Sequence, residues 1–173
     1  TMMDLQPSKV VSGKGWQLKQ GVSKSAQQGI RIEGGRARSV KIENLTVAEI
    51  GKVLAENVHP ASRLQTDEAW HYRPLGKRFA AHETVNHAKK EYARGDVSTN
   101  SVEGYFGLFK RGMVGVYQHC GEQHLQWYLT EFDFRYSHRT AVGVDDAERT
   151  ERAVKGAEGR RLTYRRPDGL SAA

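Results

Sequence analysis

The sequence predicts a mixed α/β fold in which helices flank a small sheet. Some segments alternate apolar with polar residues, as strands do, and others repeat apolar residues at helical spacing. In chain order, these segments predict a hairpin, a helix, a strand, a helix, a strand and two further helices. At 173 residues the chain is long enough to bury the core of one domain.

The first strands are expected to follow an N-terminal segment without periodicity. No hydrophobic period persists across residues 1–29, so we expect an irregular or degraded segment there, with its strand missing. Residues 30–42 then alternate around Gly34 and Gly35, which predicts a β-hairpin.

The middle of the chain alternates between helix and strand. Thr46 and Glu49 form a capping box ahead of apolar residues at helical spacing, which predicts a helix over 47–58. A strand is expected at 62–67. A partly helical stretch should follow at 68–79, limited by its proline and glycine.

The second half of the chain predicts mainly helices. A strand with a β-branched centre is expected at 82–87, followed by a polar loop at 89–98. Helices are expected at 101–111, 122–136 and 145–157.

These elements divide the chain into three parts. An irregular segment is expected at 1–29, a core at 30–145, and a helical and basic C-terminal tail at 146–173.

The composition indicates a globular protein with a basic surface. Hydrophobic residues make up 38% and charged residues 27%, a balance typical of folded domains. Lys and Arg total 27 against 20 Asp and Glu, which gives a formal net charge of +7. This excess favours a polyanionic partner through long-range attraction and counterion release, although it also serves solubility.

Cysteine and hydropathy indicate the compartment. Cys120 is the single cysteine, so no internal disulfide can form, and we expect an inert thiol in a reducing cytoplasm. No apolar run approaches the roughly 20 residues that span a bilayer. The first residues also lack the pattern of a signal peptide, so no membrane partner is expected.

Asp67 is the first candidate for a catalytic carboxylate. It ends the predicted strand at 62–67, where the strand fixes the backbone and the side chain reaches a cleft. Carboxylates in such positions are common metal ligands. A turn-forming or helix-capping role is the alternative for Asp67.

Glu103 and Lys110 form the second candidate group. They lie seven residues apart, nearly two helical turns, so both side chains project from one face of the predicted helix. That face can hold a metal ion and a phosphate together. The pattern also suits a plain surface helix, and Asn100 three residues before Glu103 suits a capping arrangement.

Phosphodiester chemistry needs more than these two acids. Two divalent metals activate the attacking oxygen and stabilise the leaving one, which takes about three acidic side chains. Mg²⁺ prefers carboxylate oxygens. Asp67 and Glu103 supply two of them, so the third lies upstream or is absent.

Several segments resemble, in order and spacing, the DDE-type insertion-sequence transposases with an ISXO-like transposase domain. The segments are residues 64–68, 82–87, 90–92, 99–112, 115–119 and 128–136. The resemblance covers about residues 34–166.

The resemblance implies an RNase H-like core and metal-dependent cutting and joining of DNA at the ends of an insertion sequence. The implied cofactor is Mg²⁺, for which Mn²⁺ can substitute. By position, Asp67 is the second metal-binding acid and Glu103 the third, while Lys110 contacts DNA near the scissile phosphate.

The first acid of this group lies on its first strand, and no such motif is present here. Asp4 is the only upstream Asp, but its surroundings lack the motif. The resemblance therefore implies a transposase without its N-terminal part.

Other residues are assigned more generally. His82 and His87 are expected on alternate faces of one strand, one with a partner and one near the cleft, and zinc is not expected because the paired spacing of a closed site is missing. Two roles are open for the aromatic residues of the last long helix, base stacking and core packing, and core packing is favoured. These residues are Trp127, Tyr128, Phe132, Phe134 and Tyr136. Contacts to DNA, or else a solvated surface, are expected for the polar and basic residues near the acids: Asn100, Lys110, Arg111, Lys89, Lys90 and Arg94.

The leading hypothesis is thus a transposase catalytic domain for DNA transposition and recombination by a mobile element. Its partners would be double-stranded insertion-sequence ends and target DNA, bound by a homo-oligomer in the cytoplasm of a bacterium, with the nucleoid. The alternative is a catalytically inactive transposase remnant that only binds DNA. A ribonuclease on the same fold is a third hypothesis.

Overall fold

The structure is a computed structural model of the chain. It describes residues 9–14, 26–32, 35–118 and 120–160, with side chains described from residue 35 onward. Residues 161–173 of the predicted C-terminal tail, and Asp4, lie outside the described residues.

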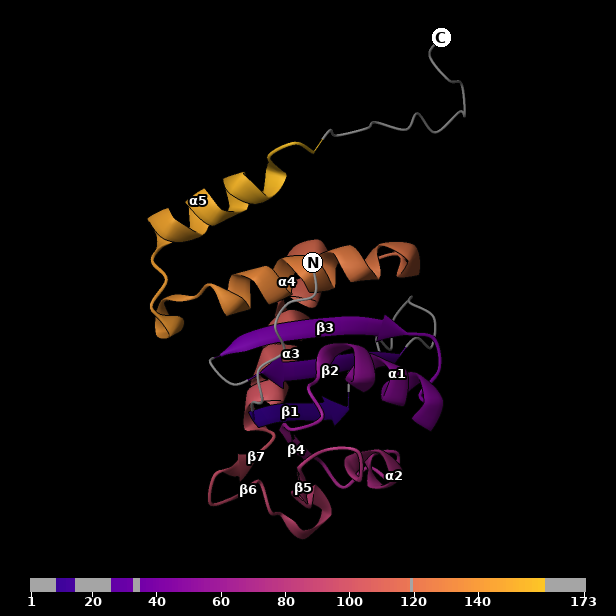
Figure 1. Ribbon diagram of the computed structural model, residues 1–173. Coiled ribbons are helices and arrows are strands. Elements are labelled where there is room, and N and C mark those ends of the chain that lie inside the picture. The colour runs from indigo at the N-terminus through magenta and orange to yellow at the C-terminus, as the bar shows by residue number, and fades with distance from the viewer. Residues whose placement is uncertain (1–8, 15–25, 33–34, 119, 161–173) are drawn as a thin grey trace.

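A mixed sheet of five strands lies at the centre of the molecule, in the order β3-β2-β1-β4-β5 (Figure 1). β2 pairs antiparallel with β1 and β3, whereas β1, β4 and β5 pair in parallel. β2 therefore runs against the other four strands. The strands are β1 (Lys9–Lys14), β2 (Ala26–Ile32), β3 (Arg36–Ile42), β4 (Arg63–Thr66) and β5 (Ala81–Thr84).

The expectation of an irregular segment at 1–29 is wrong for two stretches. β1 lies at the middle of the sheet, and β2 begins at Ala26. Strand pairing here overrides a sequence with little β propensity, because both neighbours of β1 supply ladder partners. The hairpin is confirmed, since Ile32 pairs with Arg36 across the predicted turn.

Five helices accompany the sheet in the described part of the chain. They are α1 (Val47–Asn57), α2 (Tyr72–Gly76), α3 (Asn100–Gly112), α4 (Leu125–Ser137) and α5 (Asp146–Ala157). Shorter turns are η1 (His87–Lys89), η2 (Met113–Tyr117, a π-helical turn), η3 (Glu122–His124) and η4 (Thr140–Val142). Every predicted helix is present, with bounds shifted by a few residues.

The start of α1 shows how the sequence defines an element. The Thr46 hydroxyl accepts a hydrogen bond from the Glu49 amide at 3.2 Å, as a capping box requires. The Glu49 carboxylate accepts from the Asn44 amide at 2.8 Å, two residues before the cap. The predicted helix start is confirmed.

Two hydrophobic clusters form on the two faces of the sheet. Val40 and Ile42 of β3 pack into a cluster with α1, β4 and α2, around Leu54 and Leu64. Ala37, which points to the other face because side chains alternate along a strand, packs against the cluster of α3 and α4. Phe109 of α3 lies at the centre of that second cluster and is fully buried.

Helix α4 covers the outer edge of β3. Three backbone amides of this edge strand donate to side chains of the helix: Ala37 to Ser137 Oγ at 2.9 Å, Ser39 to Asp133 Oδ2 at 2.6 Å, and Lys41 to Gln126 Oε1 at 2.9 Å. These side chains replace a neighbouring strand, so the edge is closed to further pairing.

The polar loop predicted at 89–98 contains a small hairpin. β6 (Ala93–Arg94) pairs antiparallel with β7 (Val97–Ser98), and Gly95 adopts a φ of +61° in the turn. Glycine has no Cβ to oppose that conformation. The hairpin leads directly into α3.

Helix α5 follows the core and makes few contacts with it. Its residues are exposed except for Glu148 and Arg149, which are partly exposed. Figure 1 shows α5 lying apart from α4. Within the described residues, no helix has the length and apolar character needed to cross a membrane.

Candidate functional site

Asp67 lies directly after β4, where the sequence predicts it. Its Oδ1 atom accepts a hydrogen bond from the Ala69 amide at 3.1 Å, which forms a local turn. The turn-forming alternative is therefore confirmed for one carboxylate oxygen. Within the described residues, Oδ2 has no hydrogen-bond or ion-pair partner.

Glu103 lies in the first turn of α3, and its side chain is 54% exposed. Thr99, not Asn100, occupies the N-cap position of α3, so the predicted capping arrangement of Asn100 with Glu103 is wrong. The Thr99 hydroxyl instead donates to Glu103 Oε1 at 3.1 Å. This contact links the carboxylate to the residue that begins the helix.

His87 connects Glu103 to the end of β4. Its Nε2 atom lies 2.9 Å from Thr99 Oγ1 and 3.2 Å from Glu103 Oε1. Its backbone amide donates to Glu68 Oε2 at 3.0 Å, and Glu68 directly follows Asp67. A chain of contacts thus joins Glu103 to Glu68, the residue that follows Asp67.

The expectation that both histidines lie on one strand is wrong. β5 ends at Thr84, and His87 begins the turn η1, because Asn86 caps that turn by accepting from the Lys89 amide. His82 remains on β5, where its Nε2 lies 2.9 Å from Thr66 Oγ1. His82 therefore has a partner in the sheet, and His87 lies beside Glu103.

The donor set suits a hard divalent cation. Mg²⁺ commonly binds to one or two carboxylates and keeps several waters, and Asp67 and Glu103 are side chains of that class. The described residues contain no group of three or more Asp, Glu, His or Cys side chains able to hold a metal. The structure therefore offers two carboxylates where two-metal chemistry needs about three acids.

Strand β1 pairs in parallel with β4, which Asp67 directly follows. Ser12 pairs with Thr66, so Gly13 follows in register beside Asp67. The sequence of β1 contains no Asp or Glu. Asp4, the upstream candidate, lies outside the described residues.

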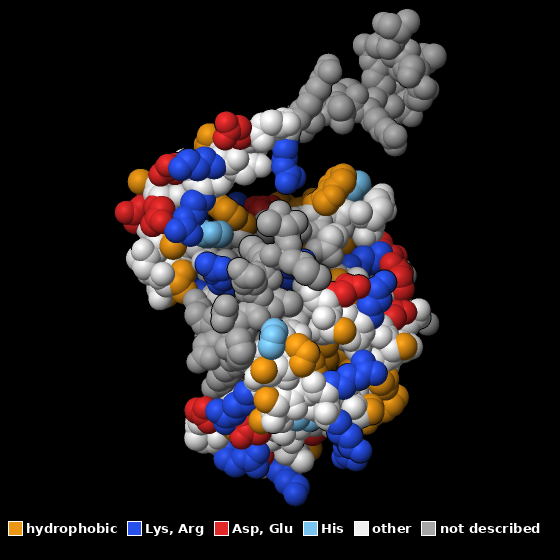
Figure 2. Space-filling model, in the orientation of Figure 1, with side chains coloured by type: hydrophobic (Ala, Val, Ile, Leu, Met, Phe, Trp, Pro, Cys, Tyr) orange, Lys and Arg blue, Asp and Glu red, His pale blue; other side chains and the backbone are white. Residues whose placement is uncertain are grey.

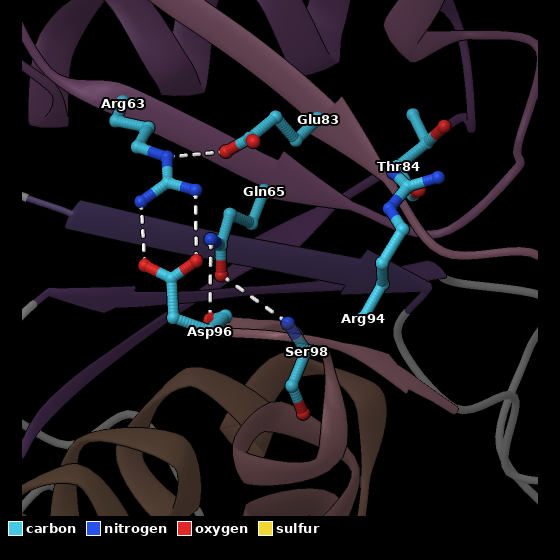
Figure 3. Close-up of polar contacts among 7 residues, drawn as sticks. All are labelled: Arg63, Gln65, Glu83, Thr84, Arg94, Asp96 and Ser98. Atoms are coloured by element: carbon cyan, nitrogen blue, oxygen red, sulfur yellow. Dashed lines mark hydrogen bonds and ion pairs between the residues drawn. The ribbon is translucent and has the colours of Figure 1, made fainter. Parts of the chain in front are cut away.

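A polar clamp fixes the β6–β7 hairpin against β4 (Figure 3). The Arg63 guanidinium binds Asp96 through two nitrogens, at 2.5 and 3.0 Å, and also binds Glu83. Hydrogen bonds and the opposite charge raise the pKa of Arg63, and the bond from Arg63 lowers the pKa of Glu83. One guanidinium binds two carboxylates here, and all three side chains have partners within the chain, which favours a structural role.

Gln65 completes this clamp beneath the hairpin. Its amide is fully buried, donates to the Asp96 carbonyl at 3.4 Å and accepts from the Ser98 amide at 3.3 Å. Ser98 precedes α3 by two residues. β4 therefore carries Asp67 at its end and, through Gln65, fixes the segment that leads to Glu103.

The predicted DNA contacts are all exposed. Lys110 and Arg111 lie in the last turn of α3, and Asn100 lies at its start. Figure 2 shows Lys and Arg side chains gathered at the lower end of the molecule, where β5, β6, β7 and α2 lie. The exposed basic residues of that region are Arg73, Lys77, Arg78, Lys89, Lys90 and Arg94.

The last long helix confirms core packing for Phe132, but not for Trp127. Phe132 is buried in the cluster of α3 and α4, where its ring meets Phe109 at 5.0 Å. Trp127 is 71% exposed and lies against His124, because it projects from the outer face of α4. Cys120 is buried, and burial raises the pKa of its thiol, as expected of an inert cysteine.

Sequence reasoning missed a second carboxylate network beneath α3. Asp133 accepts hydrogen bonds from the Ser39 hydroxyl at 2.8 Å and the Tyr105 hydroxyl at 2.5 Å. Burial raises the pKa of Asp133, and burial beside that carboxylate raises the pKa of Tyr105. The available signal was Asp133 itself, a polar residue on the apolar face of the helix predicted at 122–136.

Comparison with known proteins gives one family match. The model of the family described as ISXO2-like transposase domain matches residues 12–137. No match was found among the curated proteins. A cryoEM structure of the simian T-cell lymphotropic virus intasome with PP2A regulatory subunit B56 gamma is similar at 14% identity and a TM-score of 0.43; the match covers 72% of this chain and 48% of that chain.

Proposed function

The chain belongs to the ISXO2-like transposase domain family, and we propose that it is a transposase catalytic domain that cleaves and joins DNA at insertion-sequence ends. The observation that carries this proposal is the state of Asp67 and Glu103. Each carboxylate uses one oxygen for a contact within the chain and leaves the other uncommitted among the described residues.

We infer an RNase H-like core from the order and direction of the strands. Five strands in the order β3-β2-β1-β4-β5, with only β2 reversed, support this assignment together with helices on both faces. The parallel strands β1 and β4 place their carboxyl ends at one edge, where a site is expected. The core begins at β1 in this proposal, earlier than residue 30.

The proposed mechanism assigns separate tasks to the chain's residues. Asp67 and Glu103 would hold a divalent ion, with Mg²⁺ the expected one and Mn²⁺ a substitute. Such an ion, when bound, activates the attacking oxygen and stabilises the leaving oxygen of a phosphodiester. Lys110, on the same face of α3 as Glu103, would bind a phosphate and orient the strand.

The partners in this proposal are double-stranded insertion-sequence ends and target DNA. Exposed Lys89, Lys90, Arg94 and Arg111 support phosphate contact, as does the net charge of +7. Asn100 would contact DNA at the start of α3. A homo-oligomer would assemble on the two ends, in a bacterial cell and with its nucleoid.

Cleavage of a labelled insertion-sequence end tests the proposal. The wild-type chain should nick the end in Mg²⁺ and remain inactive in EDTA. Asp67→Asn removes one metal-binding charge at nearly constant shape and should abolish nicking. Nicking by Asp67→Asn at the wild-type rate would refute the assignment.

A second candidate function is DNA binding without turnover, by an inactive transposase remnant. The absence of any acid from β1 supports it, together with the lack of a three-residue metal group among the described residues. It predicts salt-dependent DNA binding and no nicking in Mg²⁺.

Gly13→Asp separates the two candidates, because it places a carboxylate in register beside Asp67. If the site lacks only this acid, the variant should gain Mg²⁺-dependent nicking over an inactive wild type. If the wild type already nicks DNA, the remnant hypothesis fails. Gly13→Asn serves as the matched control without charge.

A further inference from the structure

We propose that His87 is a positioning residue that orients the Glu103 carboxylate, so that Oε2 is left to bind the divalent ion. The inference rests on the proposed function and adds a residue outside the acids themselves. The observation behind it is that two donors, from Thr99 and His87, converge on the same oxygen, Oε1.

The hydrogen inventory determines which groups donate. The Thr99 hydroxyl has one hydrogen and gives it to Glu103 Oε1 at 3.1 Å. Thr99 Oγ1 must then accept at its 2.9 Å contact with His87, so Nε2 carries a hydrogen. Glu103 Oε1, 3.2 Å from the same nitrogen, shares that donor.

His87 is itself fixed at several points. Its backbone amide donates to Glu68 Oε2 at 3.0 Å, and its ring packs edge-on against Tyr92 with 5.5 Å between centroids. Asn86 caps the turn that contains it by accepting from the Lys89 amide at 3.1 Å. Because the imidazole is fixed in this way, its Nε2–H direction is fixed too.

Thr99 also restrains the Glu103 carboxylate. It is 1% exposed and forms the N-cap of α3, so its hydroxyl cannot relax toward water. Outer-shell partners of this kind orient metal ligands, and losing one usually costs about 10–100-fold in metal affinity. Glu103 is 54% exposed, and such a side chain would otherwise sample several rotamers.

His82 provides a matched control within the same protein. Its Nε2 lies 2.9 Å from Thr66 Oγ1, the same kind of His–Thr contact at the same distance. No contact joins His82 to Glu103 among the described residues. Removing His82 should therefore affect folding and leave the Glu103 carboxylate oriented as in the wild type.

Mn²⁺ binding, measured by electron paramagnetic resonance without DNA, tests the role of His87. His87→Ala should raise the Mn²⁺ Kd about 10–100-fold, with Tm close to the wild-type value. His87→Gln should restore most of the affinity, because its amide nitrogen still donates toward Thr99 and Glu103. His82→Ala should lower Tm and leave the Kd unchanged.

Two results would overturn the inference while leaving the metal site in place. One is His87→Ala binding Mn²⁺ with the wild-type Kd. The other is His82→Ala weakening Mn²⁺ as much as His87→Ala, which would indicate general loosening. A wild-type chain that binds no Mn²⁺ would overturn the proposed metal site itself, and the role of His87 with it.

Discussion

Two carboxylates, Asp133 packed against α3 and Glu103 on α3 itself, are held in different ways. Asp133 lies beneath the helix and has both oxygens occupied: Oδ1 by Ser39 and Tyr105, and Oδ2 by the Ser39 amide. Glu103 lies on the outer face, and its two donors, Thr99 and His87, both reach Oε1. Residues 103 and 105 are about 200° apart around the helix, which separates the two networks.

This difference distinguishes a structural carboxylate from one available to a ligand. Both carboxylate oxygens of Asp133 accept hydrogen bonds. These bonds fix the edge of β3 and the position of Tyr105 together. Glu103 is held through Oε1 alone, and Oε2 has no hydrogen-bond or ion-pair partner among the described residues. Asp67 follows the second pattern, with Oδ1 bound to Ala69.

The largest predicted effect separates the two carboxylates by activity. Glu103→Gln should reduce Mg²⁺-dependent cleavage at least 100-fold, about 2.7 kcal/mol, while the free energy of unfolding changes little. Asp133→Asn should lower the free energy of unfolding and leave cleavage nearly unchanged, because its amide nitrogen faces the Ser39 amide, which is also a donor. Cleavage assays and urea unfolding of both variants would measure this. Equal losses of unfolding free energy in Glu103→Gln and Asp133→Asn would contradict the distinction between a structural carboxylate and an available one.

Tyr105→Phe tests the buried network from the opposite side. It removes a donor to Asp133 and the phenol oxygen that lies 2.9 Å from the Ser39 hydroxyl, both in the core. Unpaired buried polar groups should lower the free energy of unfolding by about 1–3 kcal/mol. Urea unfolding measures the loss, and Phe134→Leu on α4 is a control without these bonds. An unchanged stability would show that the network contributes nothing.

Much of the fold follows from the sequence, and the exceptions have physical reasons. Thr46, Glu49 and the apolar spacing after them define α1 through contacts only a few residues apart. β1 is different, because it forms by pairing with β4, a distant segment in which Arg63 lies opposite Lys9. A segment of Gly, Ser and Lys carries no local signal of such pairing.

The candidate site divides in the same way. Asp67 and Glu103 are predicted from their positions at a strand end and in a helical turn, and the structure places them there. The link between them through Glu68 and His87 depends on where η1 lies against α3, which no local pattern encodes. The same holds for Asp133, whose partners lie 28 and 94 residues away.

Lys110→Ala tests whether the outer face of α3 meets DNA. Loss of one phosphate contact should weaken binding severalfold and reduce the slope of log K against log salt by about 0.9. Lys52→Ala on α1 is the matched control, because Lys52 is exposed on a helix of the other sheet face. Fluorescence anisotropy at several salt concentrations measures both. Equal effects from the two variants would place DNA elsewhere.

The smallest predicted effect concerns pH. Burial lowers the pKa of His82 below its usual 6.5, so the stability it contributes is present above pH 6.5 and is lost as pH falls through the lowered pKa. Burial raises the pKa of Asp133, so its contribution is lost as pH rises through the raised value. His82→Gln should flatten the acid side of the curve of unfolding free energy against pH. A curve that is unchanged below pH 6.5 would contradict this assignment.

A double-mutant cycle on Mn²⁺ affinity tests most directly whether Asp67 and Glu103 form one site. The single variants Asp67→Asn and Glu103→Gln should each weaken Mn²⁺ at least about 10-fold, since each removes one ligand of the same ion. The double variant should bind scarcely more weakly than either single variant, because residues that act as a unit are not additive. Strictly additive losses, or a single variant with wild-type affinity, would contradict a shared metal site.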